Sequence, residues 1–195
     1  MKSLLLLLAL SANAATINFA SDLMAEFNSR GPNVAASVDP SWEPNSATSI
    51  WVTCAGCYDT PATSLDAPTA TFSEMIFLPP GTWAGSVTVW ADDTATVLLD
   101  GVVIIPPNPT EIEHCALPPG CMPGQESTAQ LALLGGMHVF EEQAYQIVDN
   151  TPFAVRYQAF LTDDLSRGGG SDVPEPQALV LVGGGLVLMR IARRR

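Results

Sequence analysis

A strand–turn–strand pattern in residues 86–105 constrains the fold of this chain more than any other feature. Apolar and polar side chains alternate in residues 86–91, and the apolar runs 95–99 and 102–105 flank the dipeptide Asp100-Gly101. Alternation with period two buries one face of a sheet, and Asp-Gly between such runs is a strong signal for a type I′ hairpin turn. The pattern therefore predicts antiparallel β-structure.

The remainder of the body also favours short strands separated by Pro, Gly and Asn. We expect strands at 17–19, 49–53, 72–78, 86–91, 137–148 and 153–161. Pro79-Pro80-Gly81 is expected to end the strand before it, and residues 129–134 fit a strand or one helical turn. In the last two strands, the residues expected to share one face are Val139, Tyr145 and Ile147, and Phe153, Val155, Tyr157 and Leu161. No segment of useful length has a helical period, so the pattern predicts an all-β fold, an antiparallel β-sandwich.

Four motifs follow one another in an order that matches a known class of sandwich. They are Trp42, Ile50-Trp51-Val52, Phe77-Leu78-Pro79, and a run from Val89 through Asp92-Asp93 to Asp100-Gly101. Across residues 34–161 this order resembles the jelly-roll domains with a galactose-binding-like fold. The resemblance implies the fold more than a function.

The first 14 residues have the features of a secretion signal. Lys2 precedes an apolar run from Leu4 to Leu10, and Ala12-Asn13-Ala14 supplies the small residues that signal peptidase requires. We expect cleavage after Ala14, which leaves residues 15–166 as the sandwich domain. The alternative of a buried N-terminal helix is disfavoured because the run has no amphipathic period.

The last 23 residues contain a motif, an apolar segment and a basic cluster, in that order. The motif is Val173, Pro174, Glu175 and Pro176, the apolar segment is 178–189, and the cluster in 190–195 consists of Arg190, Arg193, Arg194 and Arg195. This order resembles the PEP-CTERM sorting tail of Gram-negative bacteria that make exopolysaccharide. The resemblance implies that an exosortase cleaves near Pro-Glu-Pro and that the body reaches the cell surface or the extracellular space.

The length and the charge of the tail agree with temporary anchoring in the inner membrane. Twelve apolar residues form a helix of roughly 18 Å, which is shorter than a hydrocarbon core of roughly 30 Å. The arginines are expected to stay cytoplasmic, which places the body outside. Residues 167–172 form a Gly/Ser-rich spacer before the motif. A permanent, uncleaved anchor is the alternative.

The body between the two ends is strongly acidic. The whole chain has 8 Lys and Arg and 20 Asp and Glu; 5 of the basic residues and one acid lie in residues 1–14 and 173–195, so the body has 3 basic residues and 19 acids. Because Lys and Arg supply most of the affinity for phosphate backbones, nucleic-acid binding is excluded. An acidic surface suits an extracellular protein, including one that collects divalent cations.

Four cysteines form two close pairs, each around a turn-forming segment. In an oxidising compartment we expect disulfides, with local closure of Cys54 with Cys57 and of Cys115 with Cys121. A zinc site using these thiolates, or three of them with His114, is a less favoured alternative. A thioredoxin-like motif is disfavoured because no βαβ pattern surrounds Cys54.

No catalytic constellation is evident in the sequence, so we expect no enzyme. Neither His114 nor His138 accompanies a nucleophile motif, and the paired acids 92/93, 141/142 and 163/164 point to opposite faces if they lie on strands. Asp92 and Asp93 could converge in a turn and hold Ca²⁺, or could bond to the turn's own backbone. Trp83 is expected to be exposed and to contact ligand, whereas Trp42, Trp51 and Trp90 are expected in the core.

Three functions remain open from the sequence. The first is an exported, exosortase-processed surface or matrix protein that binds exopolysaccharide or other matrix components. The second is a structural envelope or biofilm protein without a specific ligand. The third is a secreted hydrolase whose acid pair is not recognisable.

Overall fold

The computed structural model describes residues 14–24, 26–57, 65–108, 117–148 and 152–163 of the 195-residue chain. These residues form nine strands and no helix, and all strand pairing is antiparallel. The strands are β1 (Thr16–Ala20), β2 (Glu26–Asn28), β3 (Asn33–Ala35), β4 (Val52–Cys54), β5 (Ala70–Asp92), β6 (Thr94–Leu99), β7 (Val102–Ile105), β8 (Ser127–Tyr145) and β9 (Ala154–Asp163). The fold is therefore the predicted all-β sandwich.

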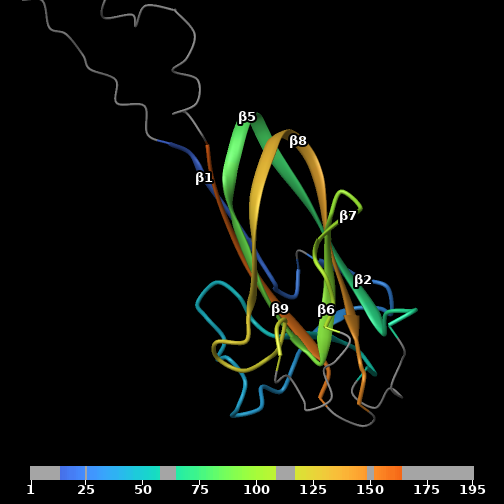
Figure 1. The fold of residues 1–195 in the computed structure, drawn as a ribbon. Coiled ribbons are helices and arrows are strands. Elements are labelled where there is room, and N and C mark those ends of the chain that lie inside the picture. Colours follow the sequence, from blue (N-terminus) through green and yellow to red (C-terminus); the bar gives the residue numbers. More distant parts are fainter. Residues whose placement is uncertain (1–13, 25, 58–64, 109–116, 149–151, 164–195) are drawn as a thin grey trace, which may run out of the picture. The chain divides into compact units, whose positions relative to one another are not determined.

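Two long, bent strands build both layers of the sandwich. β5 and β8 pair along almost their whole length and arch over together at one end of the molecule (Figure 1). Before the arch, residues 70–78 of β5 lie between β2 and residues 136–144 of β8, and β6 and β7 extend this first layer. After the arch, residues 82–92 of β5 lie between residues 127–134 of β8 and β9, which pairs with β1 and β4 to complete the second layer.

The main core lies between these layers. Phe140 of the first layer and Tyr157 of the second are 1% exposed each, with ring centroids 4.6 Å apart. Phe19 of β1 packs edge-on against Phe140 at 5.6 Å. Each such side chain stabilises the fold by roughly 1.5–3 kcal/mol through removal of apolar surface from water. The predicted shared face of Phe153, Val155, Tyr157 and Leu161 is confirmed, and all four are buried, with Phe153 directly before β9 and the others on it.

The hairpin at Asp100-Gly101 is also confirmed. β6 ends at Leu99 and β7 begins at Val102, which leaves a two-residue loop. Both loop residues have positive φ, 52° at Asp100 and 77° at Gly101. A type I′ turn requires this backbone conformation, which Asp tolerates and Gly adopts without a steric penalty.

The predicted strand end at Pro79-Pro80-Gly81 was wrong. The chain bends there and continues as one strand, with a register shift between Leu78 and Thr82. Proline is compatible with a bulge because no ladder hydrogen bond is required of it there. Gly135 of β8 crosses so closely that a Cβ on it would overlap the Pro79 carbonyl oxygen. The stretch 129–134 is accordingly strand rather than a helical turn.

Val139 and Tyr145 lie on one face of β8, as predicted, but that face is not the core face along the whole strand: Val139 is 44% exposed, whereas Phe140 on the opposite face is in the core. Glu142 also occupies a core-facing position and is fully buried. Tyr145 is buried, and Ile147 lies beyond the strand.

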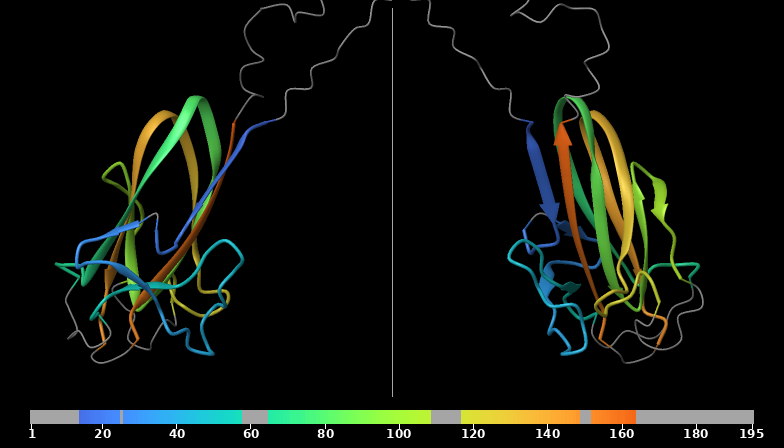
Figure 2. Two further views of the ribbon diagram at one scale, coloured as in Figure 1. Left: turned by 180° about the vertical axis from the view of Figure 1, so that it is seen from behind. Right: turned by 60° about the vertical axis from the view of Figure 1, so that its left-hand side comes forward.

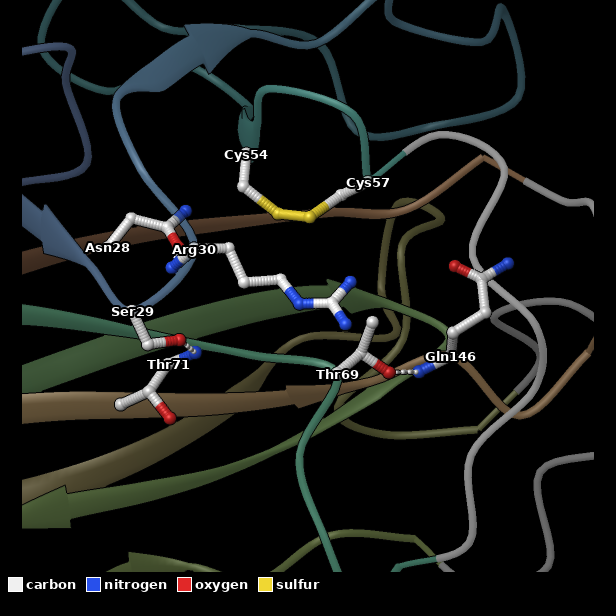
Figure 3. The surroundings of a disulfide bond; sticks show 8 residues. All are labelled: Asn28, Ser29, Arg30, Cys54, Cys57, Thr69, Thr71 and Gln146. Atoms are coloured by element: carbon white, nitrogen blue, oxygen red, sulfur yellow. Dashed lines mark hydrogen bonds between the residues drawn. A yellow bond between two sulfur atoms is a disulfide. The ribbon is translucent and has the colours of Figure 1, made fainter.

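A disulfide joins Cys54 and Cys57, as predicted (Figure 3). Both residues are buried at the end of β4, and the Arg30 side chain lies between this bond and the side chains of Thr69 and Gln146 (Figure 3). Cys121 is disulfide-bonded too, whereas Cys115 is outside the described residues. Because these three thiols are oxidised, the zinc alternative is not supported.

The two expected processing segments cannot be compared with the structure. Residues 1–13 of the signal and all of 164–195, with the sorting motif and the expected apolar helix, lie outside the described residues. The described part of the chain offers no helix with the length and hydropathy to cross a membrane.

Candidate functional site

Trp83 does not form an exposed ligand contact, contrary to our expectation. It is 2% exposed and belongs to the main core. Its indole Nε1–H donates to the Pro79 carbonyl oxygen at 2.9 Å, across the bend of β5. The Trp83 ring therefore points into the core and not toward a ligand. Trp42, Trp51 and Trp90 are core residues, as predicted.

Asp92 and Asp93 lie at the end of β5 and are buried, at 2% and 0% exposure. The Asp93 carboxylate oxygen Oδ2 accepts hydrogen bonds from the backbone N–H groups of Ile147 at 2.6 Å and Val148 at 2.9 Å. These contacts tie the end of β5 to the segment after β8. Asp93 therefore bonds to backbone, one of the two roles considered for this pair.

The surroundings of Asp92 disfavour the charged form of its carboxyl group. Burial, followed by the hydrogen bond to Asp93 and the charge of Asp93, raises the pKa of Asp92 to about 9. Ca²⁺ requires six to eight oxygens, and a bound cation would favour the charged form of both acids. Nowhere in the described residues do three or more His, Cys, Asp or Glu side chains gather as a metal site would need.

The other polar groups considered in the sequence have structural contacts. His138 Nδ1 lies 2.7 Å from Asp100 Oδ2, and its Nε2 lies 2.8 Å from the Leu134 carbonyl oxygen. The hydrogen bond to Asp100 raises the pKa of His138. Glu142 is buried, whereas its neighbour Glu141 is half-buried and points to the opposite face, as the strand pattern predicted. His114 and Asp164 are outside the described residues.

A shallow groove on the outer face of the second layer was not anticipated by the sequence analysis. It has a volume of about 270 Å³ and crosses β1, β5 and β9, and Thr48, from the segment between β3 and β4, also lines it. Its floor contains the side chains that point away from the core: Asn18, Ser86, Thr88, Gln158 and Phe160. The groove is therefore built on three strands rather than on mobile loop tips.

The strand register places these groove residues in two rows. In the first row, Ser86 of β5 pairs with Phe160 of β9, which pairs with Asn18 of β1. In the second row, Thr88 pairs with Gln158, which pairs with Ala20. Directly paired side chains on one face lie roughly 4.5–5.5 Å apart, so each row forms a continuous strip. The Thr88 hydroxyl also bonds to that of Thr128 on β8 at 3.0 Å, which extends the second row.

These rows combine an exposed aromatic ring with neutral hydrogen-bonding groups. Phe160 is 51% exposed. The amides of Asn18 and Gln158 each provide donors and an acceptor, and the hydroxyls of Ser86 and Thr88 provide both. Such a surface can stack on one face of a ring while it bonds to hydroxyls at the edge of the same ring. In the sequence, Gln158 and Phe160 alternate with the residues of the correctly predicted β9 face. This alternation was the sequence signal that placed both side chains on the outer face.

The outer face of the first layer has a different character. Met75 pairs with Val139 and Phe77 pairs with Met137 across β5 and β8, and all four side chains are 44–63% exposed. These four side chains form an apolar patch, which is next to the polar side chains of Glu141 and Gln143 on the same face of β8.

Neither a family model nor a curated protein matches this chain. The solved structures to which it is similar include a family 35 carbohydrate-binding module from Clostridium thermocellum, with 11% identity over 73% of this chain and 97% of that chain and a TM-score of 0.40. A CBM35 from Paenibacillus barcinonensis has 10% identity over 73% and 97%, with a TM-score of 0.37. A CBM36 in complex with calcium and xylotriose has 13% identity over 66% and 96%, with a TM-score of 0.26. The sandwich fold of this chain is established by its own strand pairing.

Proposed function

We propose that this chain is an exported bacterial surface protein whose sandwich binds glycan through the groove on β1, β5 and β9. One observation carries the proposal: Phe160 stands exposed in a row with Ser86 and Asn18, beside the amide of Gln158. Sugar rings have apolar faces and edges of hydroxyl groups, and both are matched by this arrangement. The site is on rigid strands, so little ordering entropy is lost on binding.

Export and processing complete the proposal. The N-terminal signal directs the chain across the inner membrane, and the tail holds it there until an exosortase cleaves near residues 173–176. The released body then stays at the cell surface or enters the extracellular matrix. Its partners are signal peptidase, the exosortase and exopolysaccharide.

Affinity electrophoresis of the exported protein through gels containing soluble polysaccharides tests glycan binding. Retardation by at least one polysaccharide is expected, because each bound ring contacts the strand face. Unchanged mobility in every gel, with the melting temperature confirming a folded protein, would refute the proposal. Albumin run in the same lanes controls for sieving.

A second candidate is a structural matrix protein that associates with other proteins rather than sugars. The apolar face of Met75, Phe77, Met137 and Val139 favours it, because exposed apolar patches mark protein contacts. Polar replacement of Phe77 would then weaken matrix cohesion and leave polysaccharide mobility shifts unaffected.

A further inference from the structure

Resting on the proposed function, we infer that the groove selects an uncharged polysaccharide and rejects chains of uronic acids or sulfated sugars. None of the nine described residues that line the groove is charged. A carboxylate-bearing sugar would therefore enter a polar site without a cation to offset its loss of hydration, which is costly for a charged group.

The two described basic residues of the body, Arg30 and Arg156, do not line the groove. Arg156 is 2% exposed, with its guanidinium 4.4 Å above the Trp90 ring and Nε donating to Ser49 Oγ at 2.9 Å. Arg30 lies beside the Cys54–Cys57 disulfide (Figure 3). Arg167 is outside the described residues. No described basic side chain lines the groove, so an anionic sugar finds no partner there.

The net negative charge of the body also disfavours the binding of anionic polysaccharides. The body contains 19 acids and 3 basic residues, the difference between the totals of the whole chain and those of its two ends. A surface of this sign lowers the local concentration of polyanions and slows their approach. An uncharged polysaccharide meets no such barrier, and its binding is insensitive to salt.

The shape of the groove favours a chain over a single sugar. The first row continues from Ser86 to Gln130 of β8, its direct partner, so it extends across four strands from Gln130 to Asn18. Four strands at a spacing of about 4.8 Å span roughly 14 Å. This length accommodates a short oligosaccharide segment that crosses the strands, with Phe160 beneath one ring and the amides at either side.

The test compares matched polymers and matched variants of the exported protein. Galactomannan and dextran serve as uncharged probes, and alginate and polygalacturonate as anionic probes. We expect at least one uncharged probe to bind, with equal affinity at low and high NaCl, and neither anionic probe to bind. Phe160→Ala should weaken binding about tenfold or more. Gln158→Ala should weaken it about three- to tenfold, through loss of a hydrogen bond.

Phe77→Ala is the matched control, because it removes another exposed phenylalanine, 63% against 51% for Phe160, from the outer face of the other layer. It should leave affinity unchanged. Ser86→Trp, which fills the groove, replaces Phe160→Ala if melting shows that variant to be unfolded. If alginate binds and Phe160→Ala abolishes that binding, the inferred selectivity for uncharged chains is overturned, whereas the proposal of glycan binding in the groove stands. Binding that responds to Phe77→Ala and not to the groove variants would overturn the assigned site, and no binding to any probe would overturn the proposed function itself.

Discussion

The backbone N–H of Asp163 donates a hydrogen bond to the carbonyl oxygen of Ala15 at 2.9 Å. β1 and β9 pair from this point, with Thr16 opposite Thr162, and they lie side by side (Figure 2). Ala15 is the residue expected to follow signal cleavage, and Asp163 is the last described residue before the spacer and the tail. The two segments proposed for processing therefore join the sandwich at neighbouring positions.

Processing at both ends predicts a defined mature chain. We expect intact-mass analysis of the exported protein to show Ala15 as the first residue and an end near residues 173–176. Replacing Pro174 and Pro176 with Ala should leave the tail uncleaved and the protein membrane-bound, because the sorting motif is lost. Asp172→Asn, outside the motif, should be processed normally. Full-length chains in the cytosol would contradict export.

Gly85 is required where β5 approaches β9. A Cβ at this position would overlap the Phe160 carbonyl oxygen and come within 3.0 Å of the Leu161 Cα. Because these are backbone atoms, Gly85→Ala must separate the strands, and we expect it to lower the free energy of unfolding by about 1–3 kcal/mol. Urea titration measures this loss.

The exposed Ala132 on β8, which pairs with Ala84, supplies a control for the glycine variant. Ala132→Ser should change stability by less than about 0.5 kcal/mol. Gly85→Ala should also weaken glycan binding, since it displaces Phe160. Wild-type stability in Gly85→Ala would show that β9 can move at no cost.

Local signals in the sequence were sufficient for part of this fold. Asp100-Gly101 specifies a two-residue hairpin because few dipeptides accept two positive φ angles. The face of β9 was predictable because Val155, Tyr157 and Leu161 keep an unbroken period of two. In both cases, neighbouring residues alone determine the outcome.

Other features depend on contacts that a local pattern does not contain. The arch of β5 and β8 follows from the close approach of Gly135 to Pro79, which lie 56 positions apart in the chain. The groove depends on the register that brings Asn18 and Ser86 to either side of Phe160. No periodicity within one strand reports which residues stand beside it on the next.

The Asp100–His138 contact predicts a pH-dependent contribution to stability. The hydrogen bond to Asp100 raises the folded-state pKa of His138 above its ordinary value of 6.5. The contribution is therefore fully present below pH 6.5 and is lost as the pH rises through the folded-state pKa. Asp100→Asn keeps an acceptor for the Val139 N–H and tolerates the positive φ, but it removes the charge.

Denaturant titrations at pH 5.5 and pH 9 test this contact. Asp100→Asn should destabilise the protein more at pH 5.5 than at pH 9. The difference between the two losses of unfolding free energy should be less than about 1 kcal/mol, because the pair is partly exposed. Ala132→Ser, at an exposed position outside this contact and without a titratable group, should show no such difference between the two pH values. An equal loss for Asp100→Asn at both pH values would indicate that only the neutral hydrogen bond matters.

Asp92 predicts a second loss of stability as the pH rises from 5 to 9. Its pKa rises from an ordinary 3.8 to about 9 on folding, chiefly because burial disfavours the charged form. Between these values the folded state holds a proton that the unfolded state has released, so the contribution to stability falls as the pH rises, by up to about 1.4 kcal/mol per pH unit. Asp92→Asn carries no titratable proton but keeps the shape and a donor toward Asp93. We therefore expect the variant to have a flatter dependence of unfolding free energy on pH between 5 and 9 and to gain stability relative to wild type as the pH increases. Parallel curves for the two proteins over this range would mean that Asp92 is ionised in the folded state.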